Sequence, residues 1–216
     1  MRYKFDEMRT KAVITGDIIN FTKLDPAARH RLIKEAEQLL KSWIKQSEDA
    51  EIFRGDSYQV LFDDVEEALK RSLVLICWFK KQSQNLGLED LGTRISIGIG
   101  EISYRGKNVL NSDGEAFHLS GRRFDKMKPN EFLTIVTNNE QKNKGIEIIL
   151  NFVNKLINQW TIGQAEVMYL ILEGKTQQEI AVELSLSQPS VNSRIKLAGW
   201  KELEPTIVYI SNLITN

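Results

Sequence analysis

The hydrophobic pattern of the chain changes at Thr137, and this change constrains the fold more than any other feature of the sequence. Before Thr137, short strand-type runs alternate with longer segments whose apolar residues recur at helical spacing. Residues 138–145 form a polar break, and every segment beyond Ile146 has helical spacing. We therefore predict an α+β domain over residues 1–137, a connecting helix and linker over 138–159, and an all-α domain over 160–216.

The order of the elements in the first domain predicts its architecture. Strands are expected at residues 12–15, 50–53, 57–62, 94–101 and 131–136, and helices at 26–46, 65–79 and 115–127. The second and third strands flank the tripeptide Arg-Gly-Asp at 54–56, a pattern typical of a hairpin. Because the hairpin lies between the first two helices, we predict a ferredoxin-like α+β sandwich.

Charge and cysteine content exclude several classes of protein. The 29 Lys and Arg residues equal the 29 Asp and Glu residues, so the whole chain has no charge excess that would draw it to nucleic acid or an anionic membrane. Any binding of a polyanion must come from a local patch. The single Cys77 rules out an intrachain disulfide, and its apolar segment is too short to span a bilayer. The charged N-terminus lacks the apolar core of a signal peptide, so we expect a cytoplasmic protein with no membrane partner.

Two Gly-Asp pairs provide the candidate metal ligands. Asp17 follows Gly16 at the end of the first predicted strand, and Asp56 follows Gly55 in the predicted hairpin turn. Two carboxylates that meet in a partly buried site repel one another unless a cation neutralises them. Mg²⁺ is commonly held by one or two carboxylates together with substrate phosphates. Gly-Asp is also ordinary turn chemistry, so the two aspartates are either turn residues or the two halves of a magnesium site.

Four segments, in order, resemble the class III nucleotidyl cyclase domain. They are "ITGDIINFT", "RGDSYQVLF", "RISIGIGEISYRG" and "SDGEAFHLSGRRFD", and the similarity covers about residues 11–137. The resemblance implies a site made of metal ligands, phosphate-binding residues and a transition-state arginine. These are Asp17, Asp56 and the Ile18 carbonyl for Mg²⁺, Asn20, Phe21, Thr22, Arg122 and Arg123 for a nucleotide or phosphate, and Arg122 with His118 for catalysis.

Several positions depart from the cyclase pattern. His118 stands where that family has an asparagine, Ile52 stands where the purine is read, and Asn20 replaces a common glycine. Arg122 matches the family, although Arg122 and Arg123 can also be read as a basic patch on a helix, and His118 as a histidine at the edge of the core. We therefore interpret this domain as a nucleotide-binding or altered-activity relative, and not as a standard adenylyl cyclase. A cyclase-like phosphorus–oxygen lyase is the alternative.

The segment "TIGQAEVMYLILEGKTQQEIAVELSLSQPSVNSRIKLAGW" predicts three short helices. Thr161 with Gln164, and Thr176 with Glu179, have the spacing of capping boxes. Ser187 is placed to cap the third helix, and Pro189 is tolerated in the first turn that follows. Helices joined in this way form a helix-turn-helix, and the segment resembles the LuxR-type and sigma-factor-region-four DNA-binding modules.

If the third helix enters the major groove, its outward residues would contact bases or phosphates. These residues are Gln188, Ser190, Asn192, Ser193, Arg194 and Lys196. Over residues 160–216, however, four basic residues face six glutamates, a net charge of −2, whereas strong phosphate binding needs several cations. The alternative is a protein-interaction or dimerisation module. A homodimer would present two recognition helices, and residues 200–214 are a candidate helix for forming it.

The combined layout resembles the SatD family of bacterial proteins over nearly the whole chain. Our leading interpretation is a cytoplasmic DNA-binding transcriptional regulator with a domain that senses a nucleotide or metal. A Mg²⁺-dependent cyclase or other phosphoryl-transfer enzyme, and a non-catalytic interaction module, are the alternatives.

Overall fold

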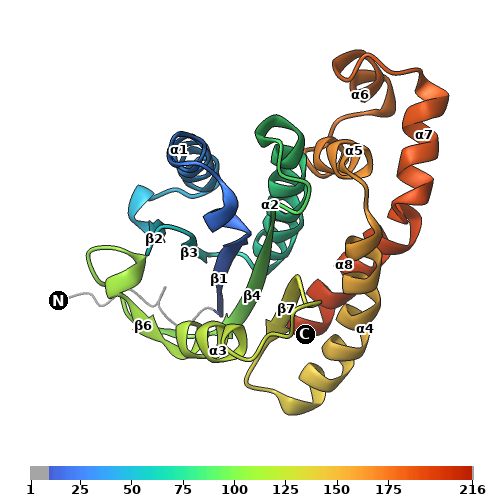
Figure 1. Ribbon diagram of the computed structural model, residues 1–216. Coiled ribbons are helices and arrows are strands. Elements are labelled where there is room, and N and C mark those ends of the chain that lie inside the picture. Colours follow the sequence, from blue (N-terminus) through green and yellow to red (C-terminus); the bar gives the residue numbers. More distant parts are fainter. Residues whose placement is uncertain (1–9, 216) are drawn as a thin grey trace.

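A computed structural model describes residues 10–215 and has a five-stranded sheet at its centre (Figure 1). The sheet order is β2-β3-β1-β4-β7, formed by β1 (Lys11–Ile19), β2 (Ala50–Phe53), β3 (Ser57–Phe62), β4 (Gly92–Gly100) and β7 (Leu133–Val136). The pairs β2/β3, β3/β1 and β1/β4 are antiparallel, and β7 runs parallel to β4. Two short strands, β5 (Ile102–Tyr104) and β6 (Asp113–Gly114), pair separately. The predicted mixed α+β class and the hairpin strands at 50–53 and 57–62 are confirmed.

Helices cover both faces of the sheet. The helices α1 (Pro26–Ser42) and α2 (Val65–Leu86) lie on one face, and α3 (Glu115–Phe124) lies on the other (Figure 1). Successive side chains of a strand point to opposite faces, and β1 is buried on both. Ile14 and Ile18 belong to the main apolar cluster with α1 and α2, whereas Val13 packs in a smaller cluster with Phe117 of α3.

Five helices follow the sheet. They are α4 (Glu140–Gln159), α5 (Ile162–Leu172), α6 (Gln177–Glu183), α7 (Gln188–Leu197) and α8 (Trp200–Thr215). A helix, α4, lies in the predicted connecting segment 138–159, but the prediction that helical structure begins only at Ile146 is wrong, because α4 begins at Glu140. The side chain of Asn139 caps it by accepting hydrogen bonds from the backbone N–H groups of Gln141 and Lys142. Within residues 10–215, none of the helices combines the length and apolar character needed to cross a bilayer.

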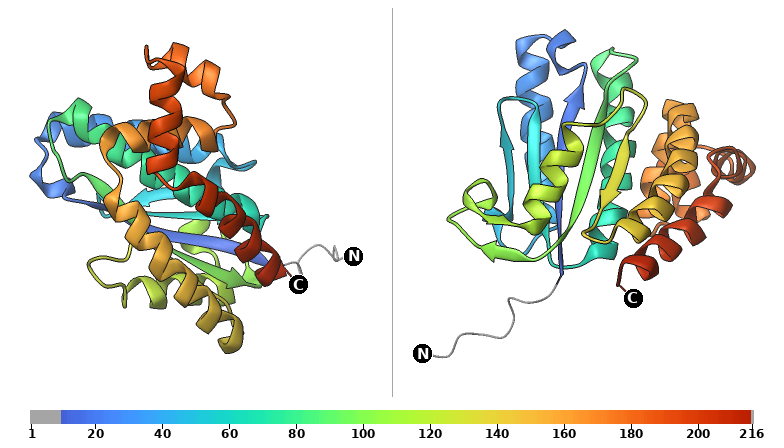
Figure 2. Two further views of the ribbon diagram at one scale, coloured as in Figure 1. Left: turned by 90° about the vertical axis from the view of Figure 1, so that its right-hand side faces the viewer. Right: turned by 90° about the horizontal axis from the view of Figure 1, so that it is seen from below.

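The C-terminal helices share the main core with the sheet. Ala165 and Met168 of α5, and Leu203 and Ile210 of α8, belong to the same apolar cluster as the residues of β1 and α2. Figure 2 shows α4 and α8 side by side along this flank of the molecule. A separate apolar cluster, which includes Ile180, joins α5, α6 and α7 to one another. The helix α2 packs against α5 and α8 as well as against the sheet, so these contacts do not mark a domain boundary. The division into domains at residues 137 and 160 therefore stays a prediction.

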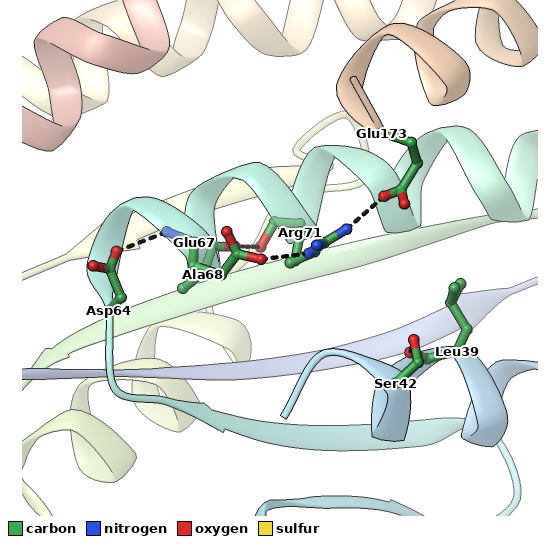
Figure 3. A network of polar contacts seen from close by, with 8 residues as sticks. Leu39, Ser42, Asp64, Glu67, Ala68, Arg71 and Glu173 are labelled. Atoms are coloured by element: carbon green, nitrogen blue, oxygen red, sulfur yellow. Dashed lines mark hydrogen bonds and ion pairs between the residues drawn. The ribbon is translucent and has the colours of Figure 1, made fainter. Parts of the chain in front are cut away.

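Arg71 of α2 links three helices at the contact between α2 and α5 (Figure 3). Its Nε lies 2.7 Å from a carboxylate oxygen of Glu67 and its Nη1 lies 2.5 Å from one of Glu173, the residue that ends α5. The guanidinium is also 5.0 Å from the ring centre of Trp43, at the end of α1. The arginine side chain is largely buried. The contact between α2 and α5 therefore combines ion pairs with apolar packing.

The free edge of β7 is covered by asparagine side chains of α4. Asn154 accepts hydrogen bonds from the N–H groups of Phe132 and Leu133, and its amide donates to the Leu133 carbonyl, each at 2.9 Å. At the other end of the strand, the Asn143 side chain accepts a hydrogen bond from the Thr137 N–H and donates one to the Thr137 carbonyl. An uncovered edge strand leaves backbone groups unpaired, and α4 supplies their partners.

Gly16 makes room for a buried aromatic ring that crosses β1. A Cβ atom added at Gly16 would lie 2.4 Å from Cζ of Tyr58, which pairs with Gly16 from the neighbouring strand β3. Tyr58 is fully buried, and its hydroxyl reaches Thr93 of β4 at 2.5 Å. Thr93 in turn donates to the backbone carbonyl of Asp17. The glycine of the first Gly-Asp pair is therefore required by packing inside a strand.

Candidate functional site

Asp17 lies inside β1. The predicted strand ended at Thr15, but β1 continues to Ile19 and pairs with both neighbours past the aspartate. Asp17 faces Ser57 of β3 on one side and Arg94 of β4 on the other. The prediction that the strand ends at Thr15 is therefore wrong, because the glycine that follows accommodates Tyr58 and does not terminate the strand.

The carboxylate of Asp17 is held by Arg94. Arg94 Nη2 lies 2.5 Å from Asp17 Oδ2 and Nε lies 3.2 Å from Oδ1, so the pair is bidentate. The same guanidinium lies 5.6 Å from the ring centre of Phe124, the last residue of α3. The hydrogen bond from Arg94 to Asp17 raises the pKa of the guanidinium. The charge of Asp17 is thus compensated by a cation of the chain itself.

The hairpin turn brings Asp56 next to β1. The backbone N–H of Ile18 donates to the Asp56 carbonyl at 2.9 Å, and Ser57 Oγ donates weakly to the Asp56 carboxylate at 3.4 Å. The turn depends on Arg54 and Gly55, both with positive φ. The sequence prediction that the two Gly-Asp segments lie side by side is thus matched by the backbone.

A magnesium ion at Asp17 would have to displace Arg94, because the guanidinium occupies both carboxylate oxygens. Among residues 10–215, no group of three or more His, Cys, Asp or Glu side chains could hold a metal ion. The Asp56 backbone carbonyl meets the Ile18 N–H beside Asp17, but within the described residues no recorded contact joins the carboxylates of Asp17 and Asp56. A bound phosphate would therefore have to complete the coordination of Mg²⁺.

The residues after β1 are occupied by contacts within the chain. Asn20 has a left-handed backbone, with φ of 61°, and its side-chain amide donates to the Asp90 carbonyl at 2.9 Å. Phe21 and Thr22 belong to a short 3-10 helix, η1 (Phe21–Lys23). Arg29 of α1 donates to the Thr22 carbonyl and lies over the Phe21 ring. Asn20 therefore ties the end of β1 to the loop before β4.

The three candidate residues of α3 have different surroundings. Arg123 pairs with Glu131 at 3.1 Å. His118 Nε2 lies 2.9 Å from Asp113, and the histidine side chain is 53% exposed, so it is a surface residue and not a histidine at the core edge. Arg122 is exposed, with no ion pair to another described residue. Phe124, under Arg94, places the end of α3 beside the Asp17 pair.

The second candidate site is the exposed face of α7. The helix begins after a short turn in which Ser185 has φ of 52°, and Val191 and Ile195 anchor it to α5 and α6. Six side chains were predicted to face DNA. Gln188, Ser190, Asn192, Ser193 and Lys196 are exposed, whereas Arg194 is half-buried.

Arg194 is directed back towards α5. Its Nη1 donates to the Gly163 carbonyl at 3.3 Å and lies 3.9 Å from a carboxylate oxygen of Glu166. Lys175 pairs with Glu183 at 2.6 Å. Of the four basic residues beyond residue 160, only Lys196 and Lys201 thus have no ion pair within the part of the chain that the structure describes. The positive charge on the exposed face of α7 comes from Lys196.

Sequence reasoning did not identify Arg94 or a polar row across the sheet. Thr15 lies opposite Gln59 and Ser96 in the neighbouring strands, and Ser96 lies opposite Thr134. Thr15 hydrogen-bonds Gln59 and also Ser120 of α3. The hydroxyls of Ser96 and Thr134 have no hydrogen-bond partner among the described residues. The only available signal was the polar–apolar alternation of the strands, because cross-strand partners depend on a register that the sequence does not reveal.

Comparison with known protein families and with curated proteins finds no match to this chain.

The capping box of α5 leads to a test of the C-terminal helices. Thr161 accepts a hydrogen bond from the Gln164 N–H at 3.2 Å, and the Gln164 side chain accepts one from the Thr161 N–H at 2.7 Å. We expect Thr161→Ala to lower the free energy of unfolding by about 1 kcal/mol, measured by urea denaturation. Thr161→Ser keeps the hydroxyl and should retain most of that stability. Equal losses in both variants would contradict a capping role.

Proposed function

We propose that the protein is a DNA-binding transcriptional regulator in which α6 and α7 form a helix-turn-helix. The observation that carries the proposal is the pairing of α6 and α7 through buried Ile180, Val191 and Ile195, which leaves polar side chains along the outer face of α7. Figure 1 shows α6 and α7 at the far end of the molecule from the sheet's hairpin, a position open to a large partner. A helix presented in this way suits entry into the major groove.

The sheet supports the second half of the proposal, a sensor domain of the ferredoxin-like, cyclase-related kind. Its first four strands have the order β2-β3-β1-β4, with a helix after β1 and another after β3. That order agrees with a ferredoxin-like sandwich and with the resemblance to nucleotidyl cyclases and the SatD family. We place the regulator in the bacterial cytoplasm, as a homodimer with two recognition helices and with a nucleotide or phosphate, aided by Mg²⁺, as its signal.

DNA binding can be tested by selecting duplexes from a random pool with the full chain. The affinity of the selected duplex is then measured by fluorescence anisotropy at several salt concentrations. Asn192→Ala combined with Lys196→Ala is expected to weaken binding at least tenfold, because each good base contact contributes about 1–3 kcal/mol. Asn212→Ala with Lys201→Ala is a matched control, since both residues are exposed on α8.

Two outcomes would contradict this proposal. One is a pool with no enriched sequence, and the other is equal loss of affinity in the α7 variant and the α8 control. A folded dimer that retains no duplex would favour the alternative of a protein-interaction module.

A second candidate function, a Mg²⁺-dependent phosphoryl-transfer enzyme, is favoured by the approach of Asp56 to Ile18 beside Asp17. Incubation with the four nucleoside triphosphates and Mg²⁺ or Mn²⁺ tests it. Product formation that is lost in Asp17→Asn would support the enzyme. No product from any of the four nucleotides would exclude this activity.

A further inference from the structure

A cavity of about 340 Å³ lies between the end of β1, the start of β4 and the helices α2 and α4. Its walls are partly polar and partly apolar. Asn20, Lys80 and Asp90 contribute polar groups, and Ile76, Phe132 and Ile157 contribute apolar surface. Its volume falls within the usual range for small-molecule sites, which combine an apolar lining with a few polar groups.

Lys80 is the cation of this cavity. It lies on α2, is half-buried, and makes no hydrogen bond or ion pair within 4.0 Å to another of the described residues. Burial lowers the pKa of Lys80, while the negative charge of Asp90 acts in the opposite direction. A partly desolvated ammonium group without a partner is unfavourable, and an anion bound in the cavity would relieve that cost.

The loop that forms one wall is fixed in place. The Asn20 side chain holds the Asp90 carbonyl at 2.9 Å, and Ser83 of α2 donates to the Leu91 carbonyl at 3.2 Å. The carboxylates of Glu89 and Asp90 are exposed on this loop. Both residues also line the cavity, so their charge opposes an anion there, and their exposure to water weakens this repulsion. Lys80 and Ile76 line the cavity from α2.

We propose that this cavity binds a small organic anion, with its carboxylate or phosphate on Lys80 and its apolar part against Phe132 and Ile157. This site goes beyond the proposed function and does not depend on DNA binding or on a metal at Asp17. The occupant would contact the last turn of α4, because Ile157 and Asn158 line the cavity. That turn leads to Trp160, whose indole N–H donates to the Ala198 carbonyl at the end of α7 at 2.9 Å.

The test uses three probes of stated chemistry with the full chain. Phenylacetate carries both an anionic and an apolar part, phenylacetamide has the same shape without the charge, and inorganic phosphate has charge without the apolar part. Binding is measured by isothermal titration calorimetry and by the shift in melting temperature. We expect phenylacetate to bind at least about tenfold more tightly than phenylacetamide, because a hydrogen bond to a charged group is stronger than a neutral one.

Lys80→Met keeps most of the side-chain length and removes the charge, so it should remain folded and bind phenylacetate at least about tenfold more weakly. Lys34→Met, at an exposed position of α1, is the matched control and should bind as the wild type does. Asp90→Asn removes a repelling charge and should bind phenylacetate more tightly.

Binding of phosphate alone would assign the ligand to free phosphate or a phosphate ester, provided that Lys80→Met abolishes it. The proposal is overturned if neither phenylacetate nor phosphate binds. It is also overturned if Lys80→Met binds either probe as well as the Lys34→Met control.

Discussion

Replacing Gly16 by alanine is expected to lower the free energy of unfolding by about 3 kcal/mol, which is a large effect for one methyl group. The added Cβ would lie 2.4 Å from Cζ of Tyr58, far inside normal contact distance. The tyrosine ring has little room to yield. It is fully buried, its centre lies 6.3 Å from that of Phe79, and its hydroxyl is bonded to Thr93. Either the ring or β1 must move, and both belong to the core.

The measurement is urea denaturation followed by circular dichroism. Gly92→Ala is the matched control, because a Cβ there would meet its nearest atom, in Ile19, at 3.6 Å. The control should lose far less stability. Tyr58→Leu removes the ring, so the double variant with Gly16→Ala should be more stable than the two single losses added together. Additive losses would contradict a clash between these two residues.

Asn154→Ala is expected to destabilise the protein by about 3 kcal/mol, because it strips three backbone groups of their partners. The side chain of Asn154 is buried and bonds the N–H groups of Phe132 and Leu133 and the Leu133 carbonyl. These groups lie on the outer edge of β7, and β1 and β4 lie on its other side. Removing the amide leaves buried polar groups without water or a protein partner.

Asn151→Ala provides the control on the same helix, since Asn151 is exposed and makes no hydrogen bond to another described residue. Amide hydrogen exchange adds a local readout. Leu133 should lose protection in Asn154→Ala, whereas residues of β1 should lose protection only as far as global stability falls. Unchanged exchange at Leu133 would show that α4 does not protect this edge.

Much of the local structure could be predicted from the sequence. The Arg-Gly-Asp turn between two short strand-type runs predicts the hairpin strands at 50–53 and 57–62, and the residue spacing predicts the capping boxes at Thr161 and Thr176. These signals lie within a few residues of one another along the chain. The start of α4 was missed, because its first turns carry polar side chains and no apolar period marks them.

The candidate site was only partly predictable, because its contacts join distant parts of the chain. The two Gly-Asp segments do meet, but nothing near Asp17 in the sequence indicates that Arg94, from the fourth strand of the sheet, binds its carboxylate. Likewise, the spacing of α7 does not reveal that Arg194 bonds the Gly163 carbonyl. The metal, nucleotide and DNA contacts of these residues therefore remain predictions.

The position of α2 has a consequence for how the molecule can change. Every residue from Ser72 to Phe79 is buried, since this helix has the sheet on one side and α5 and α8 on the other. No side of this segment is open to water. A polar side chain introduced on the side away from the sheet would therefore be buried against the C-terminal helices. The two halves of the chain are thus not free to be exchanged as separate modules. A new C-terminal unit grafted onto this sheet would need to bring its own apolar surface shaped to α2.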